Sequence, residues 1–231
     1  MVVYHPLMAP SFDPEILQAR WVLGGVDPED LVRQALVALE QGYTGIALQQ
    51  LAGLMRPALS DLGALPDRAF AEMGLKAINR EQAVDLLVTR RAAVPNEIML
   101  SLLNTFPAFM ERWRKHIEEW RGEQAGSYND MAEFVHFVVD DLYEKGNLSE
   151  VGRVFQMMDR LLAEGDQETR DLVALGFFET LQNVTSWRPY GNKAFEQFLG
   201  PVSQRAWAEI QSAWAGKSSL ADVIRAERQH E

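Results

Sequence analysis

The sequence predicts an all-α fold without a β-sheet, built as a helical bundle in two parts. Apolar residues recur at spacings of three and four along nearly the whole chain, which is the period of an amphipathic helix. No segment shows the sustained apolar and polar alternation of a half-buried strand. Capping residues, prolines and glycines interrupt the apolar runs at helical lengths.

The N-terminal part should contain short helices. Apolar residues from Ile16 to Leu23 indicate the first. The pair Asp27-Pro28 supplies an N-cap followed by a proline in the first turn, and the helix it begins should end near Gly42. Further helices are expected over residues 47–54, 67–74 and 80–91.

A domain boundary is expected near residues 92–96. The residue before a proline is disfavoured in a helix, and Asn96 can cap the next one. We therefore divide the chain into an N-terminal helical domain over 1–94, a C-terminal helical domain over 95–216 and a polar tail over 217–231.

The C-terminal domain should consist of several amphipathic helices. After a short helix from residue 96 to about 104, a helix should start at Pro107 and end at Gly122, with Trp113 and Trp120 on its apolar side. The remaining helices are expected over 131–145, 149–165, 166–184, around Phe195 and around Trp207. Successive helix pairs of similar length also suggest short solenoid-like stacking, although no residue-level repeat supports it.

One face of the expected helix 131–145 is acidic. Met131, Val135 and Val139 share the apolar face, and the aromatic residues Phe137 and Tyr143 lie at its borders. Carboxylates beside aromatic rings are typical of a surface that captures a basic protein, and a solvated helix face is the alternative. The candidate partner-binding residues on this helix are Glu133, His136, Phe137, Asp140, Asp141 and Glu144.

A carboxylate follows two aromatic rings in the expected helix 166–184. At 100° per residue, Phe177 and Leu181 fall on the buried side, whereas Glu179 falls on the opposite side with Asn183. Gly176 on that side permits close approach by another backbone or a ligand. Glu179 and Asn183 are therefore candidate partner-facing residues, and a structural hydrogen bond or solvent exposure is the alternative.

Composition and charge exclude several classes of function. The 231 residues are 47% hydrophobic and 24% charged, contain no cysteine and carry a formal net charge of -11. Thiolate metal sites and disulfides are therefore excluded, and so acidic a chain disfavours nucleic acid and anionic lipid. Residues 1–94 contain 11 acidic and 8 basic residues, and residues 95–231 contain 22 acidic and 14 basic residues, so most of the negative charge lies in the C-terminal part. With no basic, apolar N-terminal signal and no apolar run of about 18 residues, we expect a cytoplasmic protein that does not enter membranes.

Motifs that carry enzyme chemistry are missing from the sequence. It has no Walker pattern, no HExxH and no GxSxG, and its four histidines are scattered singly. We therefore expect no metal, no cofactor and no enzymatic activity. A hydrolase remains the less favoured alternative, because Asp140, Asp159 and Glu179 could converge from different helices.

The C-terminal half resembles an uncharacterised all-helical bacterial family over residues 106–214. The resemblance is carried by FMERWRKHIEEWRGE, VFQMMDRLLAEGDQETRDLVALGFFETLQN and FEQFLGPVSQRAWAEIQSAW, and above all by the segments EGD at 164–166, GFFE at 176–179 and LGP at 199–201. Members of this family often resemble immunity proteins encoded beside polymorphic toxins. The resemblance therefore implies an immunity protein that neutralises a cognate toxin with a basic surface, with a helical adaptor as the alternative.

Overall fold

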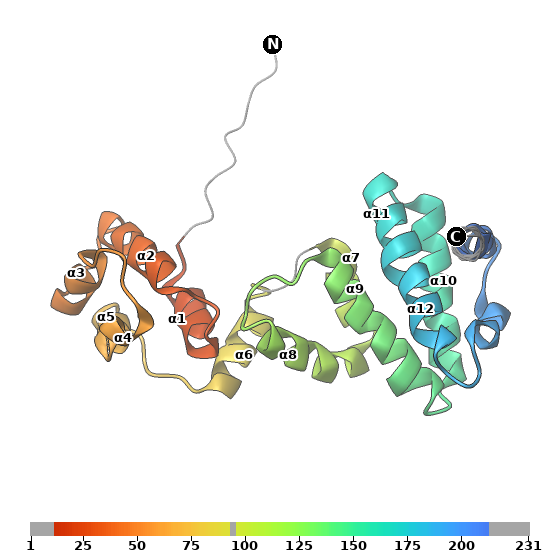
Figure 1. Ribbon diagram of the computed structural model, residues 1–231, viewed down its shortest axis with the longest axis horizontal. Helices are drawn as coiled ribbons and strands as arrows, with labels where there is room; N and C mark the ends of the chain where they lie inside the picture. Colours follow the sequence, from red (N-terminus) through yellow and green to blue (C-terminus); the bar gives the residue numbers. More distant parts are fainter. Residues whose placement is uncertain (1–11, 93–95, 213–231) are drawn as a thin grey trace, which may run out of the picture. The chain divides into compact units, whose positions relative to one another are not determined.

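The computed structural model describes residues 12–92 and 96–212, and this part of the chain is helical with no strand (Figure 1). The predicted all-α fold is confirmed. The described helices include none that combines the length and the apolar composition needed to span a bilayer. The predicted tail over 217–231 lies outside the described residues.

The chain divides into two compact units. The first comprises Met1–Val94 together with Arg114–Gln124, and the second comprises Pro95–Trp113 together with Ala125–Glu231. The segment Arg114–Gln124 thus belongs with the first unit, although the sequence division placed it in the C-terminal domain. Helix α8 accordingly begins in the second unit and ends in the first.

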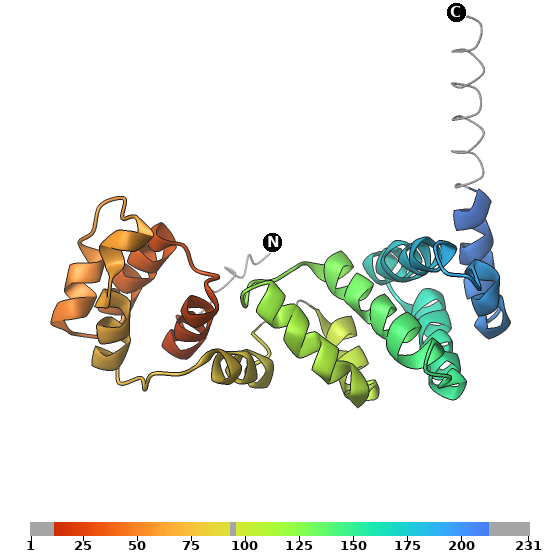
Figure 2. The same ribbon diagram turned by 60° about the horizontal axis from the view of Figure 1, so that its bottom comes forward.

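Over residues 12–92, the first unit contains six short helices. Side chains of Asp13, Asp27 and Asn79 accept hydrogen bonds from the first-turn N–H groups of α1, α2 and α6, as expected for N-caps. Helix α3 packs against α2 and α5, and the three gather into one bundle (Figure 2). The helices are α1 (Pro14–Leu23), α2 (Pro28–Glu40), α3 (Ile46–Ala52), α4 (Leu59–Leu62), α5 (Leu65–Glu72) and α6 (Arg80–Thr89).

A carboxylate from α5 caps α3. The residue before α3 is Gly45, which has no side chain to accept a hydrogen bond. Glu72 supplies the acceptors, because its carboxylate oxygens lie 3.0 Å from the backbone nitrogen of Ala47 and 2.9 Å from that of Leu48. These two hydrogen bonds lower the pKa of Glu72. A Cβ on Gly45 would stand 2.1 Å from the Glu72 carboxylate, so this cap requires glycine there.

The second unit contains longer helices with two π-helical segments. It begins with α7 (Glu97–Thr105), whose first turn is capped by Asn96 as predicted. Its later members are η1 (Pro107–Phe109), α8 (Met110–Glu119), α9 (Ser127–His136), η2 (Phe137–Tyr143), α10 (Leu148–Glu164), α11 (Gln167–Asp171), η3 (Leu172–Glu179), α12 (Thr180–Ser186) and η4 (Asn192–Phe198). Residues 203–212 form a further helix.

Segments η2 and η3 are π-helices, where the sequence predicted uninterrupted α-helix. A π-helix bonds residue i to i+5, so it turns through less than 100° per residue and directs more consecutive side chains to one side. Leu172 and Gly176 are buried for this reason, although an α-helical wheel places them opposite Phe177. Helix α9 packs along η3 at Gly176, where an added Cβ would stand 3.3 Å from Met131 Cγ.

Aromatic rings fill the core of the second unit. Phe177, which the sequence placed in the core, meets Phe178 edge to face with ring centroids 5.0 Å apart, and Phe109 meets Phe134 in the same way at 5.0 Å. Trp113 is buried as predicted. Trp120 was predicted on the same buried stripe but is 40% exposed, because α8 ends at Glu119 and the chain turns there.

Candidate partner-binding surface

Arg112 holds three of the predicted carboxylates together. This side chain on α8 is 27% exposed. Its Nε lies 2.8 Å from Asp141 Oδ2, its Nη1 lies 3.0 Å from Glu133 Oε1 and its Nη2 lies 3.3 Å from Asp140 Oδ2. The guanidinium fork thus bridges α9 and η2, a geometry that suits arginine and not lysine.

Arg188 extends this arrangement to a fourth carboxylate. Its Nη2 donates to Asp140 Oδ1 at 2.8 Å, and its Nη1 lies 3.4 Å from Glu144 Oε1. The Tyr190 hydroxyl donates to the same Glu144 oxygen at 2.8 Å. We refer to the residues Arg112, Glu133, Asp140, Asp141, Glu144 and Arg188 as the ionic cluster.

The proton affinities in and beside the cluster follow from these contacts. Burial by itself raises the pKa of Asp141, but hydrogen bonds from Lys145 and Arg112 outweigh it, and the net effect lowers the pKa. Burial likewise opposes the charge of Arg112, yet its bonds to Asp141 and Glu133 raise its pKa. Burial and the hydrogen bond to Glu144 raise the pKa of Tyr190, so the phenol remains a donor.

The other two residues predicted on this face differ in position. His136 borders the ionic cluster, with Nδ1 3.7 Å from Asp140 Oδ2. Phe137 does not lie at the surface, because it is 2% exposed and its ring packs against Phe109 with centroids 5.3 Å apart. Phe137 comes three residues after the buried Phe134 and so shares its buried face, which leaves it no anchoring area for a partner.

Glu179 and Asn183 are not members of the ionic cluster. Glu179 is half-buried at the end of η3, and Asn183 is exposed one turn later on α12. No side-chain hydrogen bond or ion pair joins either of them to another described residue. Asn183 instead lines a separate cleft.

That cleft has a volume of about 240 Å³ and is lined by uncharged polar side chains. One of them is already anchored, since Gln182 Nε2 donates to the Trp207 carbonyl at 3.1 Å. Asn192 Oδ1 likewise accepts a hydrogen bond of 2.6 Å from the Thr185 hydroxyl. We refer to this site as the amide cleft, and its lining residues are Gln182, Asn183, Ser186, Asn192 and Gln211.

Two of the three carboxylates considered for a hydrolase serve structural purposes. Asp140 is bound by two arginines of the ionic cluster. Asp159 Oδ1 accepts hydrogen bonds from the backbone nitrogens of Val202 at 3.0 Å and Ser203 at 2.7 Å, and so caps the helix over 203–212. Among the described residues, no group of three or more histidine, aspartate or glutamate side chains is placed to hold a metal ion.

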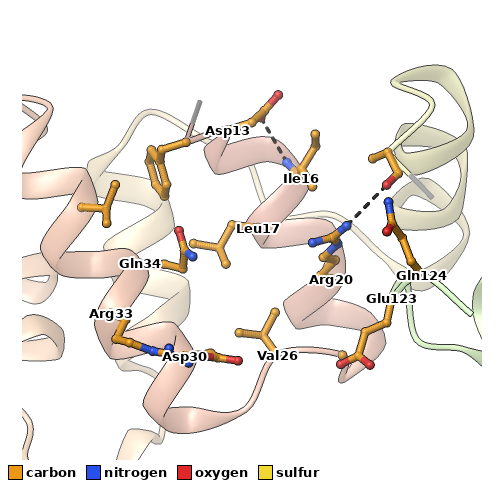
Figure 3. Close-up of a pocket in the computed structure, with 14 residues that line it drawn as sticks. Asp13, Ile16, Leu17, Arg20, Val26, Asp30, Arg33, Gln34, Glu123 and Gln124 are labelled. Atoms are coloured by element: carbon orange, nitrogen blue, oxygen red, sulfur yellow. Dashed lines mark hydrogen bonds and ion pairs between the residues drawn. The ribbon is translucent and has the colours of Figure 1, made fainter. Parts of the chain in front are cut away.

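The first unit contains a larger cavity of about 790 Å³ beside α1 and α2 (Figure 3). Its arginines are engaged with other protein groups. Arg20 Nε donates to the Gly122 carbonyl at 3.0 Å, and its Nη2 lies 3.4 Å from the Ala92 carbonyl. Arg33 pairs with Asp30 one helical turn away. Arg20 therefore ties loops together around the cavity.

Comparison with family models gives one match, to a domain of unknown function, DUF7674, over residues 99–215. The chain belongs to the DUF7674 family. The match covers the stretch in which the sequence resembled an uncharacterised domain. No curated protein and no solved structure matches the chain.

The sequence segments that carried the resemblance have structural roles in the DUF7674 region. Gly176 allows α9 to pack along η3. A Cβ on Gly200 would stand 2.5 Å from the Asp159 carboxyl carbon, so glycine lets Asp159 reach and cap the helix over 203–212. Asp166 caps α11 by accepting a hydrogen bond from the Thr169 backbone nitrogen at 2.8 Å.

Sequence reasoning missed the cations and the amides of the DUF7674 region. Neither Arg112 nor Arg188 was among the candidate residues. The excess of carboxylates on residues 131–145 was the available signal, because clustered carboxylates require nearby cations. For the amide cleft the signal was weak, since Gln182, Asn192 and Gln211 come from three segments.

Proposed function

We propose that the chain is a cytoplasmic immunity protein that captures and neutralises a toxin protein with a basic surface, and that it is a binding protein and not an enzyme. The resemblance over residues 106–214 motivates the immunity role. The observation that carries the binding role is the ionic cluster, in which arginines hold four carboxylates in fixed positions. Fixed side chains lose little conformational entropy when a partner binds, so preorganisation favours affinity.

Two carboxylates of the cluster remain able to accept from a partner. Both oxygens of Asp140 and of Asp141 are bonded to cations. Glu133 and Glu144 are bonded through Oε1 alone. Among the described residues, the Oε2 atoms of Glu133 and Glu144 therefore remain as acceptors for lysine or arginine of the partner.

The net charge supports the same kind of partner. Carboxylates exceed lysines and arginines by 11 in the whole chain. Such a field accelerates encounter with a basic protein, and the acceleration weakens as salt screens the charges. The ionic cluster then supplies the contacts at close range.

The protein encoded by the neighbouring gene provides the test. We expect it to be toxic to cells that lack this chain, and we expect the purified chain to bind it and protect those cells. The double variant Glu133→Lys with Glu144→Lys should slow association and reduce its salt dependence. The matched control is Glu164→Lys with Glu168→Lys, which changes the net charge equally at two exposed positions.

The comparison of the two double variants isolates the cluster. Equal loss of association rate in both would assign the effect to net charge alone and would contradict a role for the ionic cluster. A neighbouring product that is harmless, or that the chain fails to bind, would remove the immunity role. An adaptor would bind several proteins without protecting cells from any of them.

A further inference from the structure

The amide cleft has the chemistry of a neutral hydrogen-bonding site. None of its five lining side chains carries a formal charge. Charged groups such as phosphate or carboxylate would lose hydration there without gaining a counter-ion. The cleft therefore suits a ligand with neutral donors and acceptors.

Several of the lining groups remain available to such a ligand. The Asn183 and Gln211 amides make no hydrogen bond to another described residue, and each offers one acceptor and two donors. Gln182 keeps Oε1, because it uses Nε2 for the Trp207 carbonyl. Asn192 is already held at the Thr185 hydroxyl, whose oxygen lies 2.6 Å from Asn192 Oδ1. Donors and acceptors are thus both present around one cleft.

An exposed indole follows one of the lining residues in the sequence. Trp187 directly follows the lining residue Ser186 and is 87% exposed. Its backbone remains in the right-handed helical region, with φ -91° and ψ -2°. Because it comes four residues after Asn183, it lies on the same face of α12. An exposed tryptophan of this kind is a typical interface anchor.

Glu179 completes a row along the same face. It precedes Asn183 by four residues and has a helical backbone, with φ -65° and ψ -44°. At about 1.5 Å of rise per residue, the eight residues from Glu179 to Trp187 span about 12 Å. An extended peptide of about four residues covers that length, at about 3.3 Å per residue.

We propose that the amide cleft, with Glu179 and Trp187 on either side of Asn183, binds an extended segment of a partner protein. The Asn183 and Gln211 amides bind the peptide main chain, whose N–H and C=O groups alternate as their own donors and acceptors do. Glu179 pairs with a lysine or arginine of the segment, and Trp187 packs on a neighbouring side chain. A row of about 12 Å fits a linear chain better than one sugar ring.

This site goes beyond the proposed immunity role, because its residues are not those of the ionic cluster. The probe is an eight-residue peptide of alternating serine and valine with one central lysine, acetylated and amidated at its ends. Binding to the full-length chain is followed in ¹H–¹⁵N spectra through the side-chain amides of Asn183 and Gln211 and the indole N–H of Trp187. We expect saturable shifts with a Kd in the millimolar range or tighter.

Two changes in the peptide and three in the protein assign the contacts. Methylation of the peptide main-chain nitrogens should weaken binding at least about tenfold, as should Asn183→Ala or Trp187→Ala. Replacing the lysine with norleucine should weaken binding to the unaltered chain several-fold. The Glu179→Gln variant should bind the lysine peptide and the norleucine peptide with equal affinity. Tyr128→Ala and Gln156→Ala are the controls, because both change exposed side chains elsewhere in the second unit and should bind as the unaltered chain does.

Three outcomes would overturn the proposal. The first is the absence of shifts at about 10 mM peptide, a concentration at which millimolar binding is detected. The second is unchanged affinity in Asn183→Ala, whose folding is verified by backbone resonances remote from the cleft. The third is saturable binding of cellotriose or maltotriose at the same resonances without peptide binding, which would make the cleft a saccharide site. None of these results depends on the identity of a toxin.

Discussion

Replacing Arg112 with methionine tests whether the ionic cluster stabilises the second unit. Methionine keeps most of the apolar stem, so the variant removes mainly the charge and the three hydrogen bonds. Asp140 keeps Arg188 and Asp141 keeps Lys145. Glu133 alone loses its arginine without a second cation among the described residues.

The expected loss of stability lies between two limits. An exposed ion pair contributes about 0.2–1 kcal/mol, whereas removing one partner of a buried pair costs about 3–5 kcal/mol. The three carboxylate side chains of Glu133, Asp140 and Asp141 are between 21% and 29% exposed, so solvent screens them in part. We therefore expect Arg112→Met to lower the free energy of unfolding by about 2–3 kcal/mol. With a urea m-value of about 2 kcal/mol/M, the midpoint should fall by about 1–1.5 M.

The effect should depend on pH. The folded-state pKa of Asp141 is lowered, so its stabilisation is present above the unfolded-state pKa of about 3.9 and is lost as pH falls through the lowered folded value. Urea unfolding should therefore show a larger difference between variant and unaltered chain at pH 7 than at pH 3. Arg160→Met is the control, since Arg160 is exposed on α10 and should change stability by less than about 0.5 kcal/mol. An equal loss at both pH values, or no loss at pH 7, would refute the reasoning.

Two further variants test the core of the second unit and the cap of α3 in the first. Phe177→Ala removes a ring with no exposed surface and should cost about 3–5 kcal/mol in urea unfolding, whereas Leu175→Ala, at a position about half exposed, should cost much less; equal costs would show that the side-chain directions in η3 are wrong. Glu72→Ala removes the acceptor for two N–H groups at the start of α3. Because those bonds lower the Glu72 pKa, the variant should be less stable than the unaltered chain at pH 7, and the difference should shrink as the pH falls through the lowered folded-state pKa. Glu40→Ala, at the exposed end of α2, should show no such pH dependence.

The sequence predicted the helices that are defined by local signals. Asp27-Pro28 starts α2 because the aspartate accepts the Asp30 N–H at 2.7 Å and the proline needs no hydrogen bond there. Asn96 starts α7 through the Met99 N–H at 2.8 Å. An N-cap involves residues that are two or three positions apart, so the sequence alone contains both partners.

Packing decided the features that the sequence did not predict. The backbone hydrogen bonds of an α-helix and a π-helix differ in span by one residue, and the same run of apolar residues is compatible with both. The contact between Gly176 and Met131, which are 45 positions apart, accompanies the π-helical register of η3. Long-range contacts of this type leave no periodic signal in a single sequence.

The position of the candidate site was only partly predictable for a similar reason. Glu133, Asp140 and Glu144 share a helix face at spacings that are visible in the sequence. Their cations Arg112 and Arg188 come from 21 or more positions away. The sequence therefore indicated an acidic surface but not that arginines hold it.

Salt dependence distinguishes the two candidate binding sites. The four carboxylates of the ionic cluster face its two arginines and the neighbouring Lys145, so little of the chain's net charge arises there. Under the proposed function, a basic partner should bind mainly through the remaining oxygens of Glu133 and Glu144. Such contacts weaken with ionic strength. Hydrogen bonds from the amide cleft to a peptide main chain involve no net charge, so the affinity of the norleucine peptide should hardly change between low and high salt. For a partner that uses both sites, added salt should lower the association rate, because electrostatic attraction accelerates the encounter. The dissociation rate should stay low and independent of salt, because the hydrogen bonds of the amide cleft determine it. If Asn183→Ala changed the salt dependence of association as strongly as Glu133→Lys with Glu144→Lys does, this division of roles would be wrong.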